Sequence, residues 1–84
     1  MAYQIAIKNS AIKSLANIPE PYFSALKNSI YALAENPRPK GCKKLKGRDS
    51  YRIRVADYRV IYEIADKVLS IEVIAIGHRR NIYE

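Results

Sequence analysis

Three arginines lie within eight residues of one another, in a stretch whose residue types favour β-strands. Arg52 and Arg54 alternate with apolar residues in the run Tyr51–Val55, and Arg59 follows after a short break. Arginine keeps its charge at any accessible pH, and its planar guanidinium group binds phosphate through two parallel hydrogen bonds. These residue types therefore indicate phosphate binding, rather than recognition of a carboxylate-bearing metabolite alone.

The spacing of the arginines predicts that they share one face of a sheet. If residues 56 and 57 form a two-residue turn, Arg54 lies opposite Arg59 and Arg52 lies opposite Ile61. We expect the other, apolar face to be covered by a helix and the arginines to face solvent. Like charges directly across two strands repel, so an external anion is expected to neutralise them. The alternative is a solvated basic face whose arginines pair with carboxylates of this chain, at Asp57, Glu63 and Glu72.

The last residues of the sequence supply a second group of candidates. After an apolar strand that ends at Gly77, the chain continues with His78, Arg79, Arg80 and, three residues later, Tyr83. A segment that follows the last strand can fold over the open face, which would bring Arg79 or Arg80 toward the sheet arginines. Tyr83 could then stack on a base. His78 is a candidate for proton transfer, because only histidine has an ordinary pKa near neutrality.

The positive charge is concentrated in the middle of the chain. Residues 38–59 hold 9 of the 15 lysines and arginines and only 2 of the 8 acids, a balance of +7 that equals the net charge of the protein. A field of this kind attracts polyanions. The composition of residues 37–47 predicts an ordered, exposed basic loop that docks RNA. The candidate RNA- or ribosome-binding residues are Lys43, Lys44, Lys46 and Arg48, with Arg80 from the end of the chain.

The elements that position these residues follow from the apolar periodicity. Alternation over residues 3–7 predicts a strand, and spacings of three and four predict a short helix at 11–16 and a longer one between 19 and 36. Residues 51–55, 58–64 and 69–77 read as three further strands. The order β-α-α-β-β-β predicts an α+β fold in which two helices pack on one face of a small, mainly antiparallel sheet. We expect a single domain that spans residues 1–84.

Composition excludes several classes of protein. Cys42 is the lone cysteine, and no cluster of metal ligands accompanies His78, so we expect neither a disulfide framework, nor a metal, nor a cofactor. The sequence shows no secretory signal and no run of about 18 apolar residues that would span a membrane. We therefore expect a soluble, cytoplasmic protein with no membrane partner.

An ordered set of motifs resembles the RelE toxins of the RelE/ParE superfamily. The motifs are Leu45-Lys46-Gly47, Tyr51–Val55, Asp57–Tyr62 and Ile76–Tyr83. The resemblance implies a type II toxin that enters the ribosomal A site and cleaves mRNA during translation. It also implies a RelB-like antitoxin that holds the toxin inactive, with operator DNA bound by the complex through the antitoxin. The implied reaction is attack of a ribose 2′-OH on the adjacent phosphate, without metal or cofactor.

The resemblance also implies roles for individual residues. Arg52 and Arg54 match basic positions near the scissile phosphate, and Arg59 matches the arginine that supports the transition state. Arg79 matches a catalytic arginine near the carboxyl terminus, and Tyr83 matches the tyrosine that stacks on or orients the nucleotide. The general base stays open, because arginine gives up its proton too reluctantly to be a good base.

Two other functions remain as alternatives. A ParE-like inhibitor of DNA gyrase would lack the ribonuclease residues, so Arg52, Arg54, Arg59 and Tyr83 together argue against it. A non-catalytic RNA-binding module would account for the basic field alone. For the antitoxin, the sequence leaves two docking modes open. One is a helix surface around Ile12, Leu15, Tyr22 and Leu26, and the other is an acidic segment laid over the arginine face.

Overall fold

The computed structural model describes residues 2–46 and 49–78. The elements occur in the order β1 (Gln4–Ile7), α1 (Asn9–Ala16), α2 (Tyr22–Ala32), β2 (Lys43–Lys44), β3 (Ser50–Val55), β4 (Tyr58–Ala65), the 3-10 turn η1 (Asp66–Val68) and β5 (Ser70–His78). No helix in the described residues is long and apolar enough to cross a membrane.

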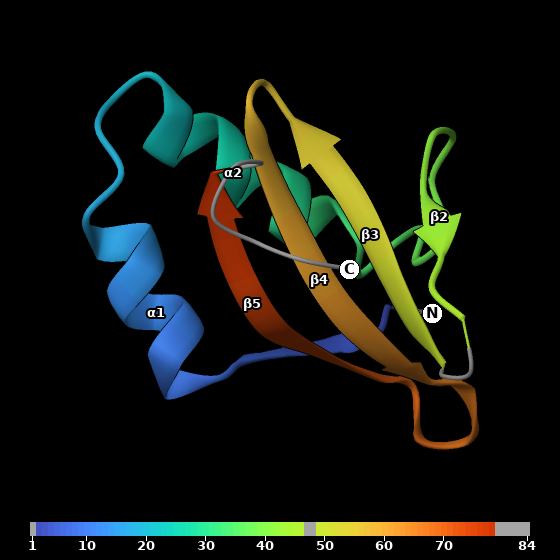
Figure 1. The fold of residues 1–84 in the computed structure, drawn as a ribbon. Helices are drawn as coiled ribbons and strands as arrows, with labels where there is room; N and C mark the ends of the chain where they lie inside the picture. The colour runs from blue at the N-terminus through green and yellow to red at the C-terminus, as the bar shows by residue number, and fades with distance from the viewer. Residues whose placement is uncertain (1, 47–48, 79–84) are drawn as a thin grey trace.

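The strands form one five-stranded sheet in the order β1-β5-β4-β3-β2 (Figure 1). The first strand pairs with the last in parallel, and the other neighbours are antiparallel. The predicted α+β class and the mainly antiparallel sheet are therefore confirmed. The strand β2 is an addition: it lies in the segment predicted to be a loop, where two lysines pair with the edge of β3.

Both helices cover the same face of the sheet. In Figure 1, α2 lies behind the strands and α1 lies beside β5. Leu26, Ile30 and Leu33 are at most 1% exposed, as expected for residues three and four apart on one stripe of an amphipathic helix. They pack with Ala11 and Leu15 of α1 against apolar side chains of the sheet, which are Tyr51, Ile53, Val60, Tyr62, Ile64, Ile71, Val73 and Ile76.

The starts of the helices differ from the sequence expectation. The first helix begins at Asn9, two residues before the predicted start at residue 11, and the capping position belongs to Lys8, whose side chain makes no capping bond. The second helix begins only at Tyr22, after both prolines. There the Glu20 carboxylate accepts hydrogen bonds from the Ser24 amide (3.0 Å) and hydroxyl (2.8 Å). These bonds lower the pKa of Glu20 and satisfy an amide in the first turn of the helix.

Candidate active site

The hairpin of β3 and β4 places the three sheet arginines. The two strands meet at a two-residue turn in which Ala56 has a φ of 54°. Arg54 lies directly opposite Arg59, and Arg52 lies opposite Ile61, as the sequence predicts. The apolar side chains that alternate with them point to the helices. The three arginines therefore share the face that the helices leave uncovered.

The three arginines differ in exposure, and the expectation that all of them face solvent is wrong for Arg52. Arg54 is exposed and Arg59 is half-buried, but Arg52 is only 7% exposed. Arg52 lies on β3, which has a neighbouring strand on each side. Arg52 has Lys43 of the unforeseen strand β2 on one side and Ile61 of β4 on the other. A long arginine side chain at such an interior position lies against its neighbours.

Two of the arginines line a small pocket at the end of the hairpin. The pocket has a volume of about 120 Å³ and is lined by Arg54, Ala56, Asp57, Tyr58 and Arg59. One water molecule occupies about 30 Å³ of liquid, so the space suits a polar group of a few heavy atoms. Two guanidinium groups at one such pocket can each donate hydrogen bonds to the same phosphate. Asp57, one of the carboxylates that the sequence offers as partners for the arginines, lines the same pocket.

The loop lysines do not act as one group. Lys43 lies opposite Arg52 and extends the basic face, whereas Lys44 lies opposite Tyr51 and therefore points to the helix side. Lys43, Lys44 and Lys46 are all exposed. Of the three lysines, Lys43 is thus the one that the sheet register places on the same face as the arginines.

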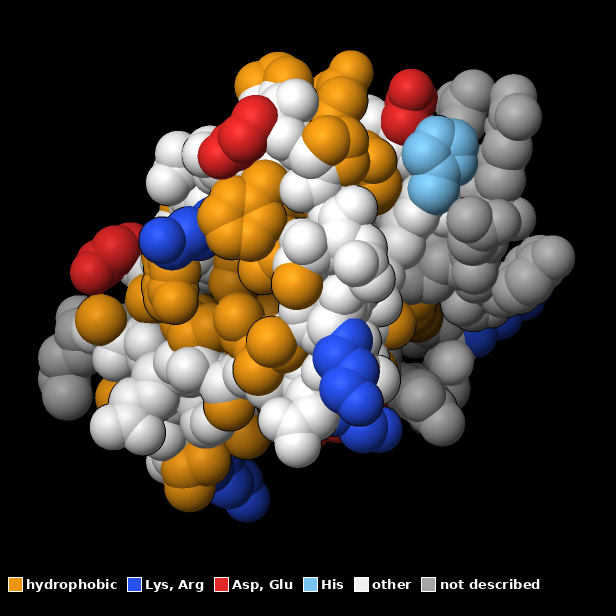
Figure 2. Space-filling model, turned by 90° about the vertical axis from the view of Figure 1, so that its left-hand side faces the viewer, with side chains coloured by type: hydrophobic (Ala, Val, Ile, Leu, Met, Phe, Trp, Pro, Cys, Tyr) orange, Lys and Arg blue, Asp and Glu red, His pale blue; other side chains and the backbone are white. Residues whose placement is uncertain are grey.

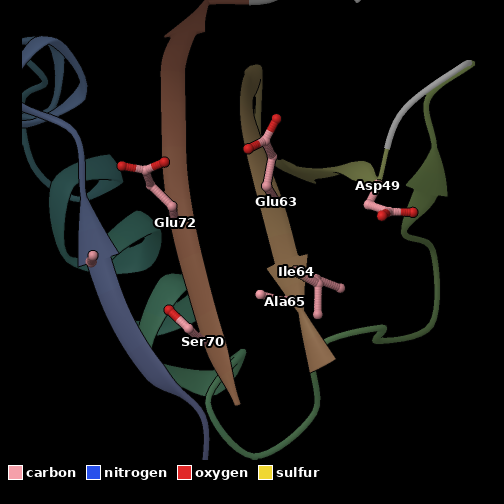
Figure 3. A pocket seen from close by; sticks show the side chains of 7 residues that line it. Asp49, Glu63, Ile64, Ala65, Ser70 and Glu72 are labelled. Atoms are coloured by element: carbon pink, nitrogen blue, oxygen red, sulfur yellow. The ribbon is translucent and has the colours of Figure 1, made fainter. Parts of the chain in front are cut away.

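The opposite end of the same sheet face is acidic. Glu63 of β4 lies directly opposite Glu72 of β5, and Figure 3 shows both carboxylates projecting from the same side of the strands. With Asp49, Ser70 and three apolar residues they line an open pocket of about 660 Å³. The buried Ser50 hydroxyl donates to Glu63 at 3.3 Å. This larger pocket repels phosphate, so we place the candidate site at the arginine end.

The remaining candidates lie elsewhere. His78 pairs with Tyr58 on the helix-covered face, where the two rings meet edge to face with centroids 5.6 Å apart. The structure therefore does not bring His78 to the arginine face. Arg48, Arg79, Arg80 and Tyr83 lie outside the described residues. Within the residues that are described, no group of three or more His, Cys, Asp or Glu side chains could hold a metal ion.

Comparisons with known proteins give consistent matches. Residues 5–83 match the family described as the ParE toxin of the type II toxin-antitoxin system, parDE. The chain is 32% identical to the putative toxin RelE1 of Methanocaldococcus jannaschii, over all of this chain and 98% of that protein. It is 29% identical to the mRNA interferase toxin RelE of Escherichia coli K12, over 94% of this chain and 85% of that toxin.

Solved structures agree with the sequence matches. The RelE–RelB complex from Pyrococcus horikoshii superposes with a TM-score of 0.85 at 28% identity, covering 98% of this chain and all of the matched one. The intact E. coli RelBE toxin-antitoxin complex superposes with a TM-score of 0.80 at 28% identity, covering 92% of this chain and 96% of the matched one. With the family match over nearly the whole chain and the RelE relatives, this protein belongs to the RelE/ParE family of type II toxins and is of the RelE type.

Proposed function

We propose that this RelE-type toxin is an endoribonuclease that cleaves mRNA in the A site of translating ribosomes and so inhibits translation. The observation that carries the proposal is the pairing of Arg54 with Arg59 across the hairpin, with both side chains lining one small pocket. Like charges directly across two strands repel, and two guanidinium groups at one pocket can both donate hydrogen bonds to a single phosphate. Relatives that are named mRNA interferases support the same activity.

The proposed reaction is attack of a ribose 2′-OH on the adjacent phosphate. The 2′-oxygen forms a bond to phosphorus, the 5′-oxygen leaves, and the products are a 2′,3′-cyclic phosphate and a 5′-OH. Arg54 and Arg59 hold the phosphate and stabilise the charge that grows on its oxygens. Arg52, beside them, adds positive charge from a more buried position. No metal or cofactor takes part, and Arg79 and Tyr83 keep the roles that the family resemblance implies.

The arginines that hold the phosphate do not transfer the protons of this reaction, so other groups must do so. A base has to accept the 2′-OH proton and an acid has to protonate the leaving 5′-oxygen. His78 is the candidate for proton transfer that the sequence offers, but its ring lies against Tyr58 on the far face of the sheet. The proposal therefore assigns binding and charge stabilisation to the arginines and leaves proton transfer to groups of the RNA or ribosome, or to residues outside those described.

A RelB-like antitoxin is the proposed inhibitor, in line with the structural relatives that are RelE–RelB complexes. Of the four helix residues considered for docking, Leu15 and Leu26 are buried in the core, while Ile12 and Tyr22 are 47% and 40% exposed. Figure 2 shows apolar side chains gathered on the side of the molecule that carries α1. A pocket of about 420 Å³ lies between α1 and the end of β5. An antitoxin segment can use this surface, and operator DNA would be bound through the antitoxin.

The test is induced expression followed by mapping of mRNA 5′ ends, with and without the antitoxin. We expect new ends that carry a 5′-OH and fall within translated codons, and we expect the antitoxin to suppress them. DNA damage without such ends would contradict the proposal and favour the gyrase-inhibitor alternative. Salt-dependent RNA binding without cleavage on programmed ribosomes would favour the non-catalytic alternative.

A further inference from the structure

Arg38, at the start of the basic segment, makes a dense set of contacts that the proposed reaction does not use. Its two terminal nitrogens donate to the two carboxylate oxygens of Asp66, at 3.3 and 2.8 Å, and its Nε donates to the Tyr51 hydroxyl at 3.1 Å. The guanidinium carbon also lies 5.0 Å from the centre of the Tyr51 ring. All of these contacts fix the direction of one planar group. We call Arg38, Asp66 and Tyr51 the clamp.

Neighbouring groups hold the clamp in place. The Tyr3 hydroxyl donates to Asp66 at 2.7 Å, and this bond raises the pKa of Tyr3 while Arg38 and Tyr3 together lower that of Asp66. The hydroxyl of the buried Tyr62 donates to the Pro37 carbonyl at 2.7 Å, one residue before the clamp. The backbone at residues 37–38 is therefore attached both to the sheet core and to the turn between β4 and β5.

The segment beyond the clamp carries the loop lysines and has few attachments of its own. It turns at Gly41, whose φ of 90° suits glycine. A hydrogen bond from the Cys42 amide to the Pro39 carbonyl (3.0 Å) closes this turn. It then pairs with β3 through the two residues Lys43 and Lys44, with one further hydrogen bond from the Leu45 amide to the Ser50 carbonyl (2.9 Å), and the partly buried Cys42 packs against the core. So short a strand pairing is weak by itself, and the position of Lys43 beside Arg52 depends on how the start of the loop is held.

The clamp is poorly suited to a purely stabilising role. The side chains of Arg38 and Asp66 are 43% and 53% exposed, and ion pairs at such exposure add little to the free energy of unfolding. A bidentate ion pair that is also held by a tyrosine hydroxyl and ring instead restricts the orientation of the Arg38 guanidinium group. Its removal should leave the fold intact and change mainly the loop.

We propose that Arg38 is a positioning residue that, through Asp66 and Tyr51, orients the lysine-bearing loop for RNA binding. The inference rests on the proposed function, because it takes RNA on the ribosome as the ligand of Lys43, Lys44 and Lys46. It goes beyond that function in assigning a role to residues that contact neither the reacting phosphate nor the arginine pocket.

The kinetic test compares Arg38→Gln with Asp66→Ala in cleavage of mRNA on programmed ribosomes. Both variants break the clamp, but the first lowers the net charge by one and the second raises it by one. We expect the KM for ribosomes to rise about fivefold in both variants, with kcat nearly unchanged. Lys67→Gln, which removes a charge next to Asp66 without touching the clamp, is the matched control and should behave like the wild type. A KM that follows net charge, or a loss confined to kcat, would overturn the inference.

A second test measures the loop directly and needs no activity. Exchange of the Cys42 and Leu45 amide hydrogens, which bond to Pro39 and Ser50, should accelerate in Arg38→Gln and in Arg38→Lys, while amides in the middle of β4 keep their protection. Unchanged exchange at both loop amides would refute the positioning role. A wild-type protein without cleavage activity would refute the proposed function instead, so the two failures can be told apart.

Discussion

At the scale of single residues, the site depends on a pair of like charges held face to face. Arg54 and Arg59 are direct partners across β3 and β4, and like charges in this position repel each other. A bound phosphate turns this repulsion into a gain, because the two charges then share one anion. Of the two arginines at the pocket, the one whose side chain is better ordered should contribute more to phosphate binding. Arg59 is half-buried, whereas Arg54 is exposed.

Replacing Arg59 with alanine should therefore abolish most of the cleavage. Loss of one fixed donor to a growing oxyanion typically costs about 10²–10³ in kcat, and the expected loss here is of that order. The measurement is single-turnover cleavage on programmed ribosomes, with circular dichroism to establish that the fold persists. Lys13→Gln on α1, far from the arginine face, controls for lost charge. Retained cleavage by a folded Arg59→Ala protein would rule out the proposed site.

His78 provides a separate test, because its ring lies on the opposite face of the sheet. His78→Gln should leave the rate of mRNA cleavage and its pH profile unchanged. It should lower the free energy of unfolding by about 0.5–1.5 kcal/mol, since the edge-to-face contact with Tyr58 is lost. Urea titration measures the stability change. If His78→Gln lost one limb of the pH profile, His78 would instead take part in proton transfer.

At the scale of elements, the turn between β3 and β4 sets the register of the site. Ala56 occupies the first turn position with a φ of 54°, a conformation that a residue with a Cβ adopts only at a cost. Ala56→Gly should relieve that cost and raise the free energy of unfolding by about 0.5–1 kcal/mol. Ala65→Gly, in an exposed strand residue with a φ of −113°, should have the opposite sign. Urea titration measures both, and a destabilised Ala56→Gly protein would contradict the expectation.

The elements also explain which parts of the site could be predicted. The register of Arg52, Arg54 and Arg59 follows from strict alternation and a two-residue turn, both of which are local. The pairing of Arg52 with Lys43 does not, because it depends on β2, a two-lysine strand with no apolar pattern from which it could be predicted. The clamp could not be predicted from the sequence either, because Arg38 and Asp66 are 28 residues apart in the chain and neither lies in a periodic segment.

At the scale of the whole molecule, one sheet face carries opposite charges at its two ends. The arginine pair lies at the hairpin end and the pair of Glu63 and Glu72 lies at the other. An RNA strand that crosses this face is attracted at one end and repelled at the other. The net charge of +7 is therefore a poor description of this face, because the positive potential is concentrated at the end where the arginines can bind one phosphate.

The acidic pair should cost stability in the free protein. Glu72→Gln removes one of two carboxylates that lie directly across from each other, so the free energy of unfolding should rise by about 0.2–1 kcal/mol at low salt. The gain should shrink as salt is added, because exposed charges are screened. Urea titrations at two ionic strengths measure both effects. A loss of stability, or a gain that ignores salt, would show that the pair is not repulsive.

The parallel pairing of β1 with β5 joins segments from the two ends of the described chain. Gln4 pairs with Ser70 and Ile7 pairs with Val73, so the sheet cannot be completed until β5 has been synthesised. Contacts between residues so distant in sequence slow folding. During synthesis, the hairpin that carries the arginines emerges before the strand that closes its sheet. The hairpin that carries the arginines should therefore lack its complete sheet until β5 has been synthesised and can pair with β1.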